Sequence, residues 1–476
     1  AFATILRIPT LKELRADHNQ LGDAGAKVAA ACLNDEIAAL ELLSLADNHI
    51  GRDGLEAVAE IQGCQNRIGL RIGMNGDSGY VGRSFAEVLA QNASIKLLDP
   101  VVEHMMTDVM QAMQAGNVHE VYFDSNSSTK ARLPASRTKV YKGLATAFQG
   151  MSSLEIVELI DHVTIGHFAE ADKLGNQRMQ AFAPALASHV ALRRLNLHGN
   201  HIGDAGAKAL ARALVDKVKL ELLDLCANSI GARGMQALSP VLESFTVLKH
   251  LNLCGNLFGN AGAQALAGAL QQKFMLEFLD VRATGLGDRS MEALSPTLES
   301  LSALKHLNLS SNNLEDAGAE ALASALEGKL ELELLDLCTN SIGDSGLQAL
   351  SSVLTNLERL KHLNLGSNSF GKRGAEALAT AFQRKLALEL LDLSLNSIGD
   401  GGMQALSTTI EGIKGLKHLN LHSCTFGDAA AEALVCVLRE LKALEELACW
   451  DNELNNSSKE VLIAAWNPRP QYKLRL

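Results

Sequence analysis

Paired cysteines, long apolar runs and a secretory signal are all missing from this sequence of 476 residues. None of its eight cysteines forms a C-x-x-C pair, and they do not gather in end caps. We therefore expect reduced thiols. No apolar run approaches the roughly 20 residues of a transmembrane helix, so we expect no direct membrane insertion. We see no signal peptide at the start of the sequence.

Aromatic residues and net charge are also scarce. Aromatic residues make up 4% of a chain that is 47% hydrophobic, so its core must be aliphatic. The formal net charge of −11 is modest for this length and argues against nucleic-acid binding. Basic partners remain compatible with the acidic balance. We find no phosphate-binding loop, nucleophile–base pair or metal-ligand cluster, so we predict no enzyme activity, no cofactor and no metal site.

The first residues, AFAT, bear on the compartment. They resemble the residues that follow the cleavage point of presequences in the complex plastids of algae. We expect an intracellular, reducing compartment, with the cytoplasm as the first choice. The alternative is an organelle, a plastid, after removal of a presequence.

What the sequence contains is a repeat of 28 residues. The stretch from Leu248 to Met275 opens with LKHLNLCGN, which follows the pattern L-x-x-L-x-L-x-x-N. The same nine-residue phrase begins at Leu192, Leu220, Leu276, Leu304, Leu332, Leu360, Leu388, Leu416 and Leu444. A fixed period of this length, opened by this phrase, predicts a leucine-rich repeat solenoid.

Each repeat has a strand half and a helix half. Leu251 and Leu253 alternate with polar or variable residues, as in a strand with one buried face. The amide of Asn256 can satisfy backbone groups of the following turn. Leu266 and Leu270 are four residues apart in an alanine-rich stretch typical of a helix. We predict an α/β fold, a solenoid (horseshoe) of about 16 repeats with a parallel sheet on the concave face and helices on the convex face.

We expect one continuous solenoid domain with three parts. Residues 1–191 hold irregular repeats, residues 192–443 hold regular 28-residue repeats, and residues 444–476 hold the last repeat and a C-terminal cap that ends in a short strand. The irregular part carries insertions at about 127–142 and 164–181. Insertions in repeat proteins often emerge on the binding face. The first insertion is basic and has no acid, so it is either a tolerated surface loop or a docking loop for an acidic partner.

The stretches NSIGARGMQAL and NHIGDAGAKAL continue the phrase with I-G-x-x-G and a full helix. In this the chain resembles the ribonuclease-inhibitor-type leucine-rich repeat family. The resemblance implies a non-catalytic scaffold that binds other proteins through the concave face and inserted loops, in some cases as a subunit of a large multi-subunit complex. Other members imply an alternative, a GTPase-activating or regulatory protein of the Ran GTPase activator or NLR-sensor type.

Strand positions that face away from the core form rows along the concave face. One row alternates lysine and glutamate on strands about 4.8 Å apart, so we interpret it as structural. A histidine row recurs on every second strand, at about 10 Å by the same spacing, which is too far for shared metal ligation.

Positions that break the repeat are the candidates for partner binding, although each can be ordinary surface. Phe278 and Arg282 stand where neighbouring repeats have leucine and small residues, with His250 and His306 on either side. Trp450 stands beside His422. Aromatic residues and arginine dominate binding hot spots. The early strands and the first insertion supply further candidates: Tyr122, Asp124, Glu158, Asp161, Lys130, Arg132, Arg137 and Lys139.

Overall fold

The structure is a computed structural model that describes residues 175–476, except 384–386 and 467–472. Before residue 175 it describes 13–16, 20–34, 42–44, 50, 57, 69–71, 94–98, 120–124 and 156–160. The chain divides into two compact units, Ala1–Asn228 and Ser229–Leu476. The second unit is described almost completely.

In the first unit every described strand pairs in parallel with its neighbour in the chain: β1, β2 and β3 form one sheet, and β4 to β8 pair in order. The elements are β1 (Glu13–Arg15), α2 (Gly22–Asn34), β2 (Leu42–Ser44), β3 (Gly69–Arg71), β4 (Ser94–Leu98), β5 (Glu120–Asp124), β6 (Ile156–Ile160), α7 (Gly175–Ala187), β7 (Arg194–Asn196), α8 (Asp204–Ala213) and β8 (Leu222–Asp224).

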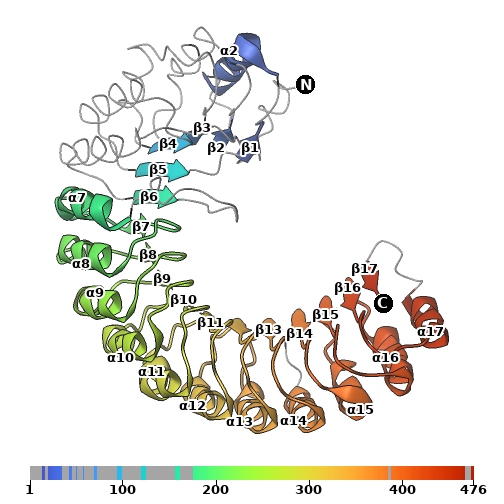
Figure 1. Ribbon diagram of the computed structural model, residues 1–476. Coiled ribbons are helices and arrows are strands. Elements are labelled where there is room, and N and C mark those ends of the chain that lie inside the picture. Colours follow the sequence, from blue (N-terminus) through green and yellow to red (C-terminus); the bar gives the residue numbers. More distant parts are fainter. Residues whose placement is uncertain are drawn as a thin grey trace. The chain divides into compact units, whose positions relative to one another are not determined.

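The second unit alternates helix and strand without exception among its described elements. They are α9 (Ala232–Ser244), β9 (His250–Asn252), α10 (Gly259–Leu270), β10 (Phe278–Asp280), α11 (Asp288–Ser300), β11 (His306–Asn308), α12 (Asp316–Leu326), β12 (Leu334–Asp336), α13 (Asp344–Leu354), β13 (His362–Asn364), α14 (Lys372–Phe382), β14 (Leu390–Asp392), α15 (Gly399–Ile410), β15 (His418–Asn420), α16 (Asp428–Glu440), β16 (Glu446–Ala448), α17 (Asn456–Trp466) and β17 (Lys473–Arg475). Within this unit the strands lie side by side on the inner side of an arc and the helices on its outer side (Figure 1).

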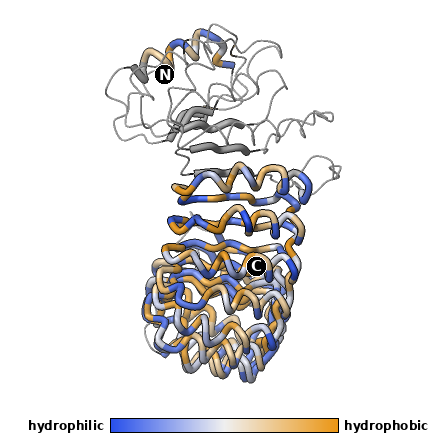
Figure 2. Tube along the Cα trace, turned by 90° about the vertical axis from the view of Figure 1, so that its left-hand side faces the viewer, coloured by the Kyte–Doolittle hydropathy of each residue, from blue (hydrophilic) through white to orange (hydrophobic). Residues whose placement is uncertain are grey.

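The core of each repeat lies between its strand and its helix. Leu251 and Leu253 from the strand segment and Leu266 and Leu270 from α10 are all fully buried. Hydrophobic and hydrophilic residues are interspersed along the described repeats (Figure 2). Neither half could bury its apolar side alone, so each repeat is stabilised by its neighbours. Because β10 and β11 pair in parallel with Phe278 opposite His306, equivalent residues of successive repeats form straight rows on the inner face.

The asparagine at the end of the phrase joins successive repeats. Nδ2 of Asn340 donates to the carbonyl oxygen of Leu337 in its own repeat at 3.0 Å and to that of Leu309 in the preceding one at 3.1 Å. Its Oδ1 accepts from the N–H of Leu314 at 3.1 Å. We call residues at this position ladder asparagines: Asn228, Asn256, Asn312, Asn340, Asn368, Asn396 and Asn452. The expectation that this amide satisfies the turn is confirmed, and the amide also reaches the preceding repeat.

Backbone N–H groups at the start of a helix are hydrogen-bonded to a side chain of the preceding repeat. Oδ1 of Asp316, at the start of α12, accepts from the N–H groups of Gly343 and Gly346 at the start of α13, at 2.7 and 2.9 Å. Residues in the same position act alike at other helices: Asn176, Asp288, Asp344, Asp400 and Asp428. Such caps occupy N–H groups that have no partner within their own helix.

Buried lysines donate hydrogen bonds to backbone carbonyl groups at helix C-termini. Nζ of Lys273 donates to the carbonyl oxygen of Glu243 near the end of α9 at 2.6 Å, and Lys273 is only 2% exposed. A cation at this end of a helix is also favoured by the helix dipole. Burial lowers the pKa of Lys273, and Glu243 partly opposes the shift. Lys217 and Lys329 make the equivalent contacts to α7 and α11.

The predicted fold is confirmed: parallel strands and helices alternate in a leucine-rich repeat solenoid. The predicted final strand is β17, which pairs with β16. The three-part division of the chain, with its two insertions, stays a prediction. Among the described helices none is long and apolar enough to cross a membrane.

Candidate protein-binding surface

Lysines and glutamates in the row on the inner face form ion pairs with one another. Nζ of Lys305 donates to Glu277 at 2.7 Å, and the same contact joins Lys361 to Glu333 and Lys417 to Glu389. Each of these three lysines therefore pairs with the glutamate of the preceding repeat. The hydrogen bond and charge of Glu277 raise the pKa of Lys305. The row neutralises itself, which agrees with the structural role predicted for it.

An aromatic stack runs across β9, β10 and β11. The rings of His250 and Phe278 are stacked, with centroids 3.9 Å apart and planes within 7°. On the other side His306 meets Phe278 edge-on, with centroids 5.8 Å apart. All three side chains are half-buried. The structure thus brings together three of the candidates that the sequence suggested and holds the phenyl ring in a fixed orientation.

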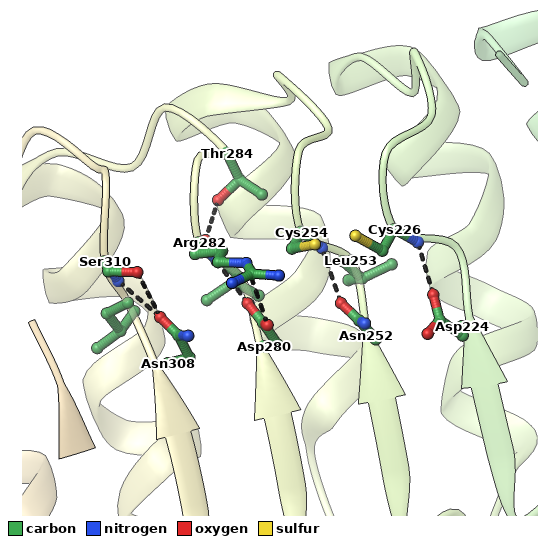
Figure 3. A network of polar contacts seen from close by, with 12 residues as sticks. Asp224, Cys226, Asn252, Leu253, Cys254, Asp280, Arg282, Thr284, Asn308 and Ser310 are labelled. Atoms are coloured by element: carbon green, nitrogen blue, oxygen red, sulfur yellow. Dashed lines mark hydrogen bonds and ion pairs between the residues drawn. The ribbon is translucent and has the colours of Figure 1, made fainter. Parts of the chain in front are cut away.

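Arg282 follows the last residue of β10 by two positions and lies over Asp280 (Figure 3). Its Nε lies 3.5 Å from Oδ2 of Asp280, and its backbone N–H donates to Oδ1 of the same carboxylate at 3.0 Å. The Asp280 side chain is 6% exposed, whereas that of Arg282 is 50% exposed. A buried carboxylate therefore anchors a guanidinium group that remains accessible.

The repeat of β10 departs from the pattern at a further position, which we missed in the sequence. Thr284 replaces the ladder asparagine, and its Oγ1 donates to the carbonyl oxygen of Val281 at 2.6 Å. Oδ1 of Asn312, in the next repeat, accepts from the backbone N–H groups of Thr284 and Leu286. The signal was available, because the phrase L-x-x-L-x-L-x-x-N lacks its final asparagine here.

A second departure lies at the repeat of β16. The rings of His422 and Trp450 are stacked, with centroids 4.2 Å apart and planes within 3°, and Trp450 is 41% exposed. Oγ of Ser423 donates to Asp451 at 2.7 Å beside this stack. The preceding repeat has Cys424 in place of a ladder asparagine, and its Sγ donates to the carbonyl oxygen of Leu393 at 3.2 Å.

The remaining candidates lie in the first unit. Tyr122 on β5 is in register with Glu158 on β6, and Asp124 is the last residue of β5. The structure describes the backbone of these three residues only. The other candidates, Asp161, Lys130, Arg132, Arg137 and Lys139, lie outside the described residues.

The cysteines whose side chains the structure describes fall into two groups. Among the described residues Cys338, Cys424, Cys436 and Cys449 are free thiols. Burial raises the pKa of Cys424 and of Cys449 to about 12, so both stay protonated at neutral pH. Cys226 and Cys254 each take part in a disulfide, which departs from the expectation of reduced thiols.

The family model described as Leucine Rich repeat matches seven segments of the sequence: 40–59, 191–211, 246–267, 300–323, 359–379, 388–407 and 416–435. The chain is built from leucine-rich repeats. The matched segments lie in both the irregular and the regular part, and the ribonuclease-inhibitor subtype stays a prediction. A comparison with curated proteins finds no match.

Three solved structures are similar to this leucine-rich repeat chain. A leucine-rich repeat protein of Leptospira interrogans is 17% identical, over 100% of this chain and 98% of that one, with a TM-score of 0.49. The internalin InlF of Listeria monocytogenes is 18% identical, over 73% of this chain and 98% of that one, with a TM-score of 0.40. A TDR receptor is 14% identical, over 94% of this chain and 73% of that one, with a TM-score of 0.43.

Proposed function

We propose that this chain is a non-catalytic scaffold that holds a partner protein against the inner face of its second unit, with the repeat of β10 as the main contact. Leucine-rich repeat proteins generally bind other proteins, and the family match covers five segments of this unit. At about 4.8 Å per strand, β9 to β17 span roughly 38 Å, which suits an interface of standard size.

The observation that carries the proposal is an internal comparison. The repeats of this chain share one fold, so residues that differ from those common to the repeats are not required by the fold. Such residues are candidates for a function. The repeat of β10 has them at three positions within seven residues of the chain, Phe278, Arg282 and Thr284. An oriented aromatic ring and an anchored arginine in the same repeat have the composition of a binding hot spot. The lysine row offers no such group, because its charges are already paired.

The test is a capture experiment with the full chain in an extract of its native source. The double variant Phe278→Ala/Arg282→Ala should reduce the recovery of a bound partner, identified by mass spectrometry. Two hot-spot residues at about 2 kcal/mol or more apiece correspond to at least roughly 30-fold weaker binding each.

The matched control removes the same residue types outside the inner face. Phe274, which is 56% exposed after α10, and Arg289, exposed on α11, serve this purpose as Phe274→Ala/Arg289→Ala. The partner should remain bound to this control. Equal recovery with both double variants would remove the repeat of β10 from the interface.

The GTPase-activating alternative and membership of a large complex stay predictions. Single-turnover GTP hydrolysis by small GTPases, with and without the chain, tests the first. Size-exclusion chromatography of the native extract tests the second, because a subunit should elute far above its own mass of 50.8 kDa.

A further inference from the structure

Three side chains with metal-binding atoms meet in the first unit, outside the proposed protein-binding surface. Asp224 is the last residue of β8, and Cys226 follows it by two residues. His198 follows β7 by two residues, and Asn196 is in register with Asp224, so His198 and Cys226 are level on adjacent strand ends. One imidazole nitrogen, one carboxylate oxygen and the Cys226 sulfur all lie within 4.8 Å of one another.

The distances are close to those of a bound ion. Zinc binds nitrogen and oxygen ligands at about 2.0–2.2 Å and sulfur at about 2.3 Å with tetrahedral angles, which places ligand atoms roughly 3.3–3.8 Å apart. Small side-chain rotations about fixed strand ends can close the remaining gap of about 1 Å. The carboxylate is already oriented, because Oδ1 of Asp224 accepts the N–H of Cys226 at 2.9 Å (Figure 3). The mixed set of nitrogen, oxygen and sulfur suits zinc.

The chain contains its own comparison for this group. Four 28-residue repeats (112 residues) later in the sequence, Asp336 and Cys338 are at the positions equivalent to Asp224 and Cys226. Cys338 is a free thiol there, and its N–H donates to Asp336 at 3.0 Å in the same way. The place of His198 is taken by Ser310, which brings no imidazole. The carboxylate–cysteine pair is therefore part of the repeat, and the histidine is what distinguishes the group in the first unit.

We propose that reduction of the Cys226 disulfide makes His198, Asp224 and Cys226 a zinc site, with water in the fourth position. Two molecules of a low-molecular-weight thiol supply two electrons and two protons and leave as their own disulfide, and the protein disulfide becomes two thiols. Zinc then binds the Cys226 sulfur as a thiolate, and its proton passes to solvent. The ion links the ends of β7 and β8 only in the reduced chain.

From the sequence we predicted no metal site, because we found no metal-ligand cluster and the histidine row is too widely spaced. Histidines on every second strand are too far apart to share an ion. The group found here combines one histidine with an acid and a cysteine of the next strand. Such a combination becomes visible only when the register between β7 and β8 is known.

The test uses the full chain with Cys338→Ser and Cys436→Ser as background, so that two free thiols outside the site do not bind metal. Co²⁺ replaces zinc as the probe, because thiolate ligation gives it a charge-transfer absorption band. After reduction with a phosphine, the chain should bind one Co²⁺ and show this band; without reduction it should not. Loss of an outer-shell partner alone weakens metal sites 10–100-fold, so His198→Ala should weaken binding by at least about 100-fold.

The matched controls are carboxamide variants of the two equivalent acids. Asp224→Asn should weaken Co²⁺ binding, whereas Asp336→Asn should leave it unchanged, with circular dichroism confirming that both fold. The proposal is overturned if the reduced chain shows no thiolate band, if His198→Ala binds Co²⁺ as the background does, or if the two carboxamide variants behave alike.

Discussion

Replacing Asn340 by alanine tests how the repeats are held together. Asn340 is 9% exposed, and its three shortest hydrogen bonds join the carbonyl oxygens of Leu309 and Leu337 and the N–H of Leu314. Alanine removes these hydrogen bonds, at about 1 kcal/mol for each. The carbonyl oxygens of Leu309 and Leu337 keep a bond from Asn312 and Asn368, whereas the buried N–H of Leu314 loses its acceptor. The expected loss is about 3 kcal/mol, felt mainly at the junction of two repeats.

Hydrogen exchange measured by mass spectrometry is the suitable assay, because a long repeat array need not unfold in one step. At 1.4 kcal/mol for each factor of ten, Asn340→Ala should speed exchange of the Leu314 amide by roughly 100-fold. Asn340→Thr should show a smaller effect, because Thr284 keeps one of these bonds at the same position. Asn313→Ala, at an exposed neighbouring residue, is the control. An Asn340→Ala effect no larger than this control would refute the ladder argument.

Three further predictions concern other contacts. Asp316→Ala removes the cap of α13 and should destabilise that helix by about 1 kcal/mol, seen as faster exchange at its first turn; unchanged exchange would contradict the cap. Lys273→Met tests the buried cation by its pH dependence. The pKa of Lys273 is lowered in the folded chain, so between that pKa and 10.5 the unfolded chain holds more protons, and this lysine favours folding more as pH rises. The stability of wild type relative to Lys273→Met, measured by urea unfolding, should therefore increase toward pH 10.5, and a decrease would refute it. Charge reversal in the first insertion should weaken binding of an acidic partner, and added salt should also weaken it. If neither change affects binding, the insertion is an ordinary surface loop. The residues to be changed to glutamate are Arg132, Arg137 and Lys139.

The repeated part of the structure could be predicted because the same physical problem recurs in every repeat. The spacing of Leu251, Leu253 and Leu266 predicts a strand, a helix and their common core, and these residues are buried as expected. The turn role of Asn256 was predicted for the same reason. The departures at Phe278 and Trp450 were also visible, since a regular pattern makes an exception plain.

Contacts between repeats were not predictable, because they depend on register in space. The sequence does not show that Asp316 caps the next helix, or that Lys273 reaches the end of the preceding one. It places Lys305 between two glutamates and does not say that Glu277 is its partner. The group of His198, Asp224 and Cys226 was not predicted either, because it depends on the register between β7 and β8.

The most direct test of the proposed function is site-specific photo-crosslinking. Phe278 is replaced by p-benzoylphenylalanine in the full chain, which is then irradiated in an extract of the native source. A parallel chain carries the same group at Phe274, which is exposed in the turn between α10 and β10. The account predicts one partner protein crosslinked at position 278 and absent at position 274. The same products at both positions, or none at position 278, would contradict it.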